Sequence, residues 1–353
     1  MGAYILTETA ADKLLVEDNG VKGVRSGDHG RGRNGEELGN FEPGSDLVAQ
    51  ATVLAEGTIG HLTYAALDHF DIHGLDPQRW ELGVKEIWEV EEPLDQVIHT
   101  MGWPLRKAAK YKEFGGSFIY PMEDNKVCIG FVVGLDYTDA TLSVHDMLQQ
   151  FKLHPFIKKI LKGGKRVGWG AKTIPAGGYW SMPKRLAVPG MCIAGDNAGM
   201  VNVAELKGVH YAMHAGMYAA EAIVDALEKD SVDFSAYDEK VHKSMIEKDL
   251  YKVRNASQPF TKGFFFGGAM ASTMTLTGGH FPGGHWKNHD DATYKVELGK
   301  AADTFQAVLL ILILLRPPAP LLDAVTWITV VLTIASGFLY LKGALSARHE
   351  ARL

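Results

Sequence analysis

The stretch CIAGDNAGMVN, residues 192–202, carries the strongest indication of the fold of this 353-residue chain. An apolar run from Met191 to Ala194 predicts a strand that ends in the turn Gly195-Asp196, and the pattern beyond it predicts a helix from about Lys207 to Leu227. Glycine after a strand lets the backbone approach a ligand closely, and Asp196 can accept hydrogen bonds from sugar or ribityl hydroxyls. The following helix would offer its positive end to an anionic group. A strand followed by Gly-Asp is, taken alone, more often an ordinary turn.

A second segment, VLAEG at residues 53–57, points to the same class of domain. The run Thr52 to Ala55 predicts a buried strand that leads into a helix carrying residues 61–70. In dinucleotide-binding folds a strand ending in Ala-x-Gly returns to the cofactor crevice, where a larger side chain would clash. Ala55 and Gly57 are therefore predicted to bind FAD together with Gly195 and Asp196. No Gly-x-Gly-x-x-Gly opens a strand-to-helix turn, because the nearest glycine-rich segment, DHGRGRNGE (28–36), is charged and is followed by no helix-forming pattern. We therefore expect only part of a doubly wound, α/β FAD-binding domain.

Between these segments, residues 81–137 alternate as antiparallel strands do, most clearly in GVKEIWEV (83–90), GGSFIYPM (115–122) and KVCIGFVVGLDY (126–137). They predict an inserted antiparallel-sheet domain and an α+β character for the whole. Residues 143–162 predict a helix that Gly163-Gly164 closes. Residues 3–57 are β-rich, and the charged stretch 28–39 within them predicts an exposed loop.

The C-terminal end is apolar. Residues 321–341 hold a single charge, Asp323, and at about 1.5 Å per residue a helix of this length would cross roughly 30 Å of hydrocarbon. With residues 304–315 and the RPPAP turn between them, the pattern predicts a transmembrane helical hairpin. Basic residues on both sides favour a cytoplasmic position for both ends. A buried core helix is the alternative.

Composition excludes some classes of function. A formal net charge of -6 gives no surplus to neutralise phosphates, so nucleic acid is not an expected partner. Cys128 and Cys192 are the only cysteines, too few for an iron-sulfur cluster held by four of them, and we expect buried thiols. His210 and His214 stand four apart on one predicted helix without a third ligand, so no metal site is predicted. No nucleophile elbow, P-loop or paired acid-base motif indicates a catalytic residue.

A series of motifs runs through the chain in unbroken order. They are GVKEIW (83–88), HTMGWPL (99–105), FGGSFIY (114–120), GFVVGLDY (130–137), FKLHP (151–155), GGKRVGWGAKTIPAGGYWSMPK (163–184) and GDNAGMVNVAELKGVHYAMHAGMYAAEA (195–222). Together they closely resemble the electron-transfer flavoprotein-ubiquinone oxidoreductase family, over roughly residues 2–290. That family passes electrons from reduced electron-transfer flavoprotein to ubiquinone, using FAD and a 4Fe-4S cluster.

The resemblance implies roles for particular residues. Gly115 and Gly116 match the glycine pair whose backbone lies against the quinone head group, and the aromatic residues Phe114, Phe118 and Tyr120 would help to wall its pocket. The second flavin-contacting segment of the family is matched by Gly195, Asp196, Gly199 and Asn202. Residues 260–274 match the stretch with which the family dips into one membrane leaflet. The implied partners are electron-transfer flavoprotein, ubiquinone and the lipid bilayer, at the cytoplasmic face of a bacterial inner membrane or at the mitochondrial inner membrane.

The resemblance also implies departures from the family. The N-terminal nucleotide-binding half and the C-terminal ferredoxin-like domain with its four cluster cysteines have no counterpart in the sequence, so we expect weak FAD binding and no entry point for electrons. Residues 298–345 resemble, less specifically, the last two membrane helices of a CDP-alcohol phosphatidyltransferase, without its aspartate motif. A gene fragment, a fusion and an assembly artefact are all compatible with this sequence.

The expected organisation has five parts. They are a partial FAD-binding domain (1–80), a quinone-binding sheet domain (81–180), the return of the FAD-binding domain (181–255), a membrane-dipping segment (256–297) and a transmembrane hairpin with a basic tail (298–353). Two other functions are compatible with the same features: an FAD-dependent reductase of prenyl chains, which shares the fold and the Gly-Asp turn, and a non-catalytic, membrane-anchored remnant. The motifs HTMGWPL and GFVVGLDY favour the quinone enzyme.

Overall fold

A computed structural model describes residues 2–58, 60–108, 111–139, 141–205 and 207–291. By internal contacts the chain divides into two compact units, one of residues 1–136 and 144–293, the other of residues 137–143 and 294–353. The account below concerns the first unit. The predicted hairpin at 298–353 and its resemblance to a phosphatidyltransferase lie outside the described residues. Among the residues that are described, no helix is both long and apolar enough to cross a bilayer.

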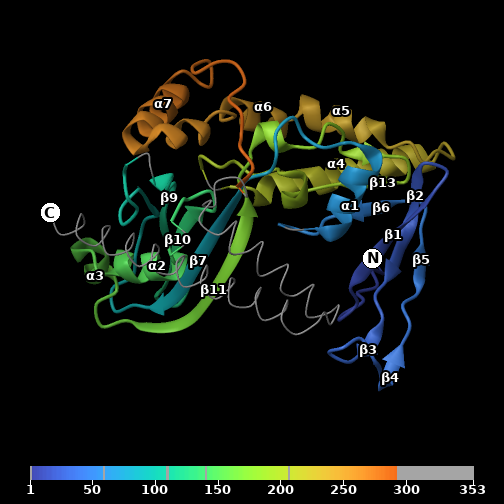
Figure 1. The fold of residues 1–353 in the computed structure, drawn as a ribbon, viewed down its shortest axis with the longest axis horizontal. Helices are drawn as coiled ribbons and strands as arrows, with labels where there is room; N and C mark the ends of the chain where they lie inside the picture. Colours follow the sequence, from blue (N-terminus) through green and yellow to red (C-terminus); the bar gives the residue numbers. More distant parts are fainter. Residues whose placement is uncertain (1, 59, 109–110, 140, 206, 292–353) are drawn as a thin grey trace, which may run out of the picture. The chain divides into compact units, whose positions relative to one another are not determined.

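The N-terminal strands form small antiparallel sheets (Figure 1). β1 (Ala11–Glu17), β2 (Gly20–Ser26) and β5 (Asp46–Val48) pair in the order β1-β2-β5. The charged stretch predicted to be a loop instead contains the paired strands β3 (His29–Arg31) and β4 (Glu37–Glu42). The prediction that this stretch is exposed is right, but the prediction that it is an irregular loop is wrong. Backbone hydrogen bonds pair the two strands although neither has an apolar face.

The two segments that indicated a nucleotide-binding domain lie side by side. β6 (Thr52–Leu54) pairs in parallel with β13 (Met191–Ile193), which also pairs with β12 (Ala187–Val188). Parallel strands end at the same edge of a sheet, so the Ala-x-Gly and Gly-Asp turns share that edge. Both predicted strands are confirmed.

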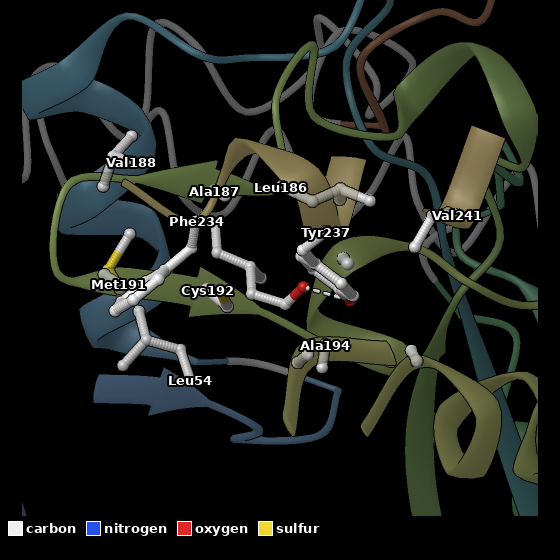
Figure 2. Packing of buried hydrophobic residues seen from close by; sticks show 14 of the residues in the cluster. Leu54, Leu186, Ala187, Val188, Met191, Cys192, Ala194, Phe234, Tyr237 and Val241 are labelled. Atoms are coloured by element: carbon white, nitrogen blue, oxygen red, sulfur yellow. Dashed lines mark hydrogen bonds between the residues drawn. The ribbon is translucent and has the colours of Figure 1, made fainter. Parts of the chain in front are cut away.

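Helices pack around this parallel pair and complete its core. They are α1 (His61–Phe70), α4 (Val209–Leu227), α5 (Ser235–Lys243) and α6 (Met245–Lys252). Figure 2 shows Phe234 and Tyr237 among the side chains around β13. The hydroxyl of Tyr237 donates to the carbonyl of Ile193 at 3.0 Å, so this buried aromatic residue anchors the helical layer to the strand before the Gly-Asp turn.

A larger antiparallel sheet has the order β11-β7-β10-β9-β8. Its members are β7 (Trp80–Glu89), β8 (Ile98–Met101), β9 (Gly115–Met122), β10 (Lys126–Gly134) and β11 (Lys165–Pro175), which lie together in Figure 1. β7, β9 and β10 confirm the three predicted strands. β8 and β11 were not predicted as strands: β8 has only four residues, and β11 contains two glycines and three basic residues, which are uncommon in strands.

The two faces of this sheet differ. α2 (Val144–Lys152) contacts β7 and β10, and its Leu148 and Phe151 are buried with Val84 and Phe131. The predicted helix at 143–162 is in fact two helices, because α3 (Pro155–Ile160) begins at a proline, whose missing N–H and ring prevent α2 from continuing. Cross-strand register puts glycines on the opposite face: Gly83 opposes Val132 and Lys172, and Gly130 opposes Phe118 and Lys85.

Glu86 of β7 connects the face of the sheet that α2 covers to α2 itself and to β11. Its carboxylate accepts hydrogen bonds from Lys152 Nζ at 2.7 Å, Arg166 Nη1 at 3.1 Å and Trp88 Nε1 at 2.8 Å, and also from Gln149. Burial alone would raise the pKa of Glu86, but these partners overcome it and lower the pKa to about 2. The ionised carboxylate therefore ties α2 and β11 to β7.

We expect Glu86→Gln to lower the free energy of unfolding by about 2–4 kcal/mol at pH 7, because Lys152 would keep its charge and lose its partner. The contribution is present above the unfolded-state pKa near 4.5 and is lost as the pH falls toward 2, so the difference from wild type should narrow in that window. Urea denaturation at several pH values measures it. Glu89→Gln, exposed at the end of the same strand, is the control; equal effects of the two changes would contradict the assignment.

Candidate functional site

A cavity of about 430 Å³ lies against the paired glycines of β9. Gly115 and Gly116 of β9 line it together with Phe114, which immediately precedes this strand. Residues 203–205 and Lys207, which follow the Gly-Asp turn in sequence, line it from the other side. The quinone-type strand and the loop after the flavin-type turn thus face the same space.

A second cavity of about 480 Å³ has residues in common with the first, among them His99, Val132 and Lys207. Phe118 and Tyr120 line this second cavity, not the first. Their rings stack with centroids 5.9 Å apart. The five residues predicted to bind quinone are therefore divided between two neighbouring cavities along one face of the sheet.

Close backbone approach explains the glycines of this face. A Cβ on Gly116 would lie 2.2 Å from the carbonyl oxygen of Thr100, and one on Gly130 would lie 2.2 Å from the ring of Phe118. Gly130 was not among the predicted site residues, although it makes room for an aromatic ring of the cavity wall. A glycine between apolar residues in a strand was the available signal for it.

The Gly-Asp turn lies at a third cavity, of about 280 Å³, lined by Asp196, Asn197, Thr58 and Trp80 among others. Gly195 adopts φ +86°, a conformation that favours glycine. Burial raises the pKa of Asp196. Within the described ranges, the Asp196 carboxylate has no hydrogen-bond partner and Asn197 Oδ1 is buried without one. Free acceptors at this edge suit hydroxyl groups of a ligand.

The remaining predicted FAD residues are placed differently. Gly57 (φ +75°) and Ala55 follow β6 at the same edge, yet neither lines the three cavities. Asn202 is buried, and its side-chain oxygen accepts from the backbone N–H of Glu205 at 3.1 Å. Its role is therefore to shape the loop that lines the first cavity. Gly199 takes φ +74° and ends the short 3-10 helix Asp196–Ala198.

The helix after the turn also differs from expectation. α4 begins at Val209 with Gly208 as its N-cap, and a Cβ on Gly208 would meet Asp196 Oδ1 at 3.2 Å. The positive end of α4 therefore faces the carboxylate of Asp196. That this end is offered to an anionic ligand group stays a prediction.

Sequence patterns gave no indication of Glu81, which also lines the first cavity. It is 2% exposed, and its Oε1 has no partner among the described residues. Burial raises its pKa to about 7, against the attraction of Arg79 and aided by repulsion from Asp136 and Asp291. Arg79 pairs with Asp136 at 2.7 Å. Asp291 accepts from the N–H of Trp80, and burial raises its pKa to about 6.

Away from the cavities, α7 (Phe264–Leu276) presents apolar side chains to the surface. Phe265 is 73% exposed and Leu276 86% exposed. Lys107 and Lys262 flank the aromatic rings of this segment, with Lys262 Nζ 5.3 Å from the ring centre of Phe266. Exposed aromatic residues ringed by lysine are typical of a protein surface that meets lipid headgroups.

Residues 80–174, which contain this sheet, match the family model described as "ETF-QO, ubiquinone-binding". The chain is 36% identical over 319 residues to the mitochondrial electron transfer flavoprotein-ubiquinone oxidoreductase of Caenorhabditis elegans, covering 86% of this chain and 52% of that protein. It is 40% identical over 275 residues to the Dictyostelium discoideum enzyme of the same name, covering 72% and 45%. It is 35% identical over 314 residues to the Pseudomonas aeruginosa enzyme, covering 86% and 56%. The chain thus spans about half the length of these relatives.

Solved structures share the fold at low sequence identity. A geranylgeranyl bacteriochlorophyll reductase-like protein from Thermoplasma acidophilum superposes with a TM-score of 0.56 at 16% identity, over 77% of this chain and 62% of that one. A triple mutant of the flavin-dependent brominase Bmp2 gives 0.50 at 16% identity, over 85% and 70%. This chain therefore shares its mixed helix and sheet architecture with these two proteins.

The raised pKa of Glu81 makes a prediction about stability. Its folded-state pKa lies near 7 and its unfolded value near 4.5, so stability that is fully present below pH 4.5 is lost as the pH rises through 7. We expect Glu81→Gln to equal wild type below pH 4.5 and to exceed it by about 3 kcal/mol above pH 7. Thermal or urea denaturation across this range measures the difference. The exposed Glu89→Gln should show no such trend, and a pH-independent Glu81→Gln difference would contradict the shift.

Proposed function

We propose that this chain binds FAD and a ubiquinone-type quinone and takes part in passing electrons from reduced electron-transfer flavoprotein to that quinone. The match of residues 80–174 to a ubiquinone-binding model, on the sheet whose paired glycines line a cavity, carries the proposal. The similarity to named oxidoreductases over most of this chain supports it. Because those relatives are about twice as long, the activity of the whole enzyme is part of the proposal.

FAD fits the edge shared by β6 and β13. Gly195 can approach a ligand without a Cβ, and Asp196 and Asn197 offer acceptors with no partner among the described residues to the hydroxyls of a ribityl chain. When bound, the flavin supplies the redox chemistry. The protein holds it next to the sheet, because β11 contacts the 3-10 helix that contains Asp196.

The quinone fits the cavity at Gly115 and Gly116. These glycines let a flat ring lie against the strand, while Val132 and Val203 supply apolar contacts. The neighbouring cavity with Phe118 and Tyr120 would take further apolar parts of the molecule. Burial and a contact with the Cys128 thiol raise the pKa of Tyr120 to about 12, with the thiol contact the larger cause, so the phenol stays neutral there.

A membrane location belongs to the same proposal. A quinone with an isoprenoid tail is delivered by lipid, and the exposed aromatic side chains Phe265 and Phe266 of α7 provide a surface that enters a headgroup layer. The bilayer would be a bacterial inner membrane, on its cytoplasmic face, or the mitochondrial inner membrane. The 4Fe-4S cluster of the family is not part of the proposal for this chain, which has two cysteines.

A reductase of prenyl chains is the second candidate, because the Thermoplasma protein shares the fold. Its likeness, at 16% identity, concerns the fold alone, whereas the 80–174 match is specific to ubiquinone binding. Reduction of a soluble quinone analogue, set against reduction of a prenyl substrate, separates the two. A chain that binds neither flavin nor quinone would be the non-catalytic remnant.

Filling the first cavity tests the quinone site. We expect Val203→Trp to weaken binding of a soluble short-chain ubiquinone at least tenfold, because the indole would occupy space beside Gly115 and Gly116. Isothermal titration calorimetry on the full chain in detergent measures the affinity. Val224→Trp, on the exposed face of α4, should bind as wild type does. An unchanged affinity of Val203→Trp for the quinone would show that the quinone binds outside this cavity.

Removing the acceptor at the Gly-Asp turn tests the flavin site. We expect Asp196→Ala to weaken FAD binding by about 10-fold or more, since a hydrogen bond to a charged group contributes about 1.5–3 kcal/mol. Quenching of flavin fluorescence during titration with the full chain gives the affinity. Asp225→Ala, exposed on α4, is the control. Equal FAD affinity for wild type and Asp196→Ala, or no binding by wild type, would count against this part of the proposal.

A further inference from the structure

Glu81 occupies an unusual position in the cavity beside Gly115 and Gly116. Its side chain is almost completely buried, lines the cavity, and has one carboxyl oxygen without a partner in the described part of the chain. A carboxyl group in such a place is strongly disfavoured in its charged form, because neither water nor a hydrogen-bond donor compensates the charge. It therefore retains a proton that a bound molecule can reach.

The charges around Glu81 come from several elements. Arg79 immediately precedes β7, and its guanidinium is paired with Asp136 beyond β10. Asp291, from the segment after α7, accepts from the N–H of Trp80, and Lys112 interacts with Asp136. Three buried carboxyl groups therefore share one buried guanidinium, which cannot stabilise all of them as anions.

The rim of the cavity carries further ionisable groups. They are His99 of β8, which is exposed, and the pair Glu205 and Lys207, whose charged atoms lie 3.0 Å apart. β11 places the uncharged Ile174 opposite Glu81. Among these lining residues, Glu81 is the buried acid, while His99, Glu205 and Lys207 are exposed to solvent.

We propose that Glu81 is the catalytic acid that delivers a proton to a carbonyl oxygen of the quinone bound beside Gly115 and Gly116. This inference rests on the function proposed above. Reduction of a quinone to its hydroquinone takes up two electrons, supplied by a reduced flavin, and two protons. The O–H bond of the Glu81 carboxyl breaks as the O–H bond of the hydroquinone forms, and the carboxylate remains. The second proton comes from water, and Glu81 regains its own from water at the cavity mouth.

The position on the strand agrees with this role. Gly134 of β10 and Ile174 of β11 flank Glu81, and Gly116 lies one strand further along the same face. A backbone N–H group cannot release a proton to a quinone oxygen, whereas a protonated carboxyl group can. A pKa near 7 lets Glu81 give and regain a proton at neutral pH.

Binding of ubiquinone-1 to the full chain at pH 6, 7 and 8 tests the proposal. We expect wild-type affinity to fall about tenfold from pH 6 to pH 8, because the protonated fraction of a group with a pKa near 7 falls by that factor. The side chain of Glu81→Gln keeps an N–H donor and cannot titrate. The affinity of this variant for ubiquinone-1 should therefore change less than about twofold between pH 6 and pH 8. The exposed Glu89→Gln should retain the wild-type profile.

Infrared spectroscopy of the ligand-free chain provides a second readout. In the wild-type chain, the carbonyl absorption of a protonated carboxyl group should be present at pH 6 and weaker at pH 8. The part of this absorption that comes from Glu81 should be absent from the spectrum of Glu81→Gln. If Glu81→Gln does not fold, Glu81→Asp serves instead, and it should keep both the absorption and a pH-dependent affinity.

The outcomes separate the inference from the function on which it rests. Quinone binding that does not depend on pH, or a dependence that Glu81→Gln shares with wild type, overturns the role of Glu81 and leaves the quinone site intact. Shared dependence would assign the titration to the rim, with His99 the first group to replace. Absence of quinone binding at every pH in wild type and Glu81→Gln alike overturns the proposed function as well.

Discussion

The two faces of the β11-β7-β10-β9-β8 sheet are the constraint on which the rest of this unit depends. Side chains of a strand point alternately to the two faces of the sheet. Each strand therefore places some side chains on the face that α2 covers and others on the face that lines the cavities. On the covered side, burial of residues such as Phe131 and Ile129 against α2 stabilises the fold by roughly 1.5–3 kcal/mol each. The other side is free to carry glycines, because the covered side already holds the sheet in place.

Two glutamates of β7, one on each face of the sheet, have pKa values that are shifted in opposite directions. Glu86 faces α2, where lysine, arginine, tryptophan and glutamine side chains hold it ionised, with a pKa of about 2. Glu81 faces the cavity, where burial without an adequate partner brings its pKa to about 7. Both are almost fully buried, so burial does not decide the direction of the shift. The number of donors within hydrogen-bond distance decides it, and that number follows from which face the residue occupies.

Sequence patterns were informative where one physical signal dominated. The apolar runs of β6, β10 and β13 identified buried strands, and the motif series located Gly115 and Gly116 at a cavity. β11 escaped prediction because the residues on its cavity face, such as Gly170 and Lys172, are glycine and lysine, which are uncommon in strands. Glu81 escaped because a charged residue at the start of a strand usually indicates solvent exposure. Two of the charges that act on its pKa, Asp136 and Asp291, are distant in sequence, and local periodicity cannot bring them to Glu81.

The loop from Asn202 to Lys207 connects the two halves of the candidate site. It leaves the Gly-Asp turn, is closed on itself by paired backbone hydrogen bonds between Asn202 and Lys207, and lines both cavities on the sheet. A buried Asn202 side chain fixes its shape from within. Because this segment leads from the turn at Asp196 to the wall of both cavities on the sheet, its conformation links the predicted flavin-contacting turn to the predicted quinone-contacting strand.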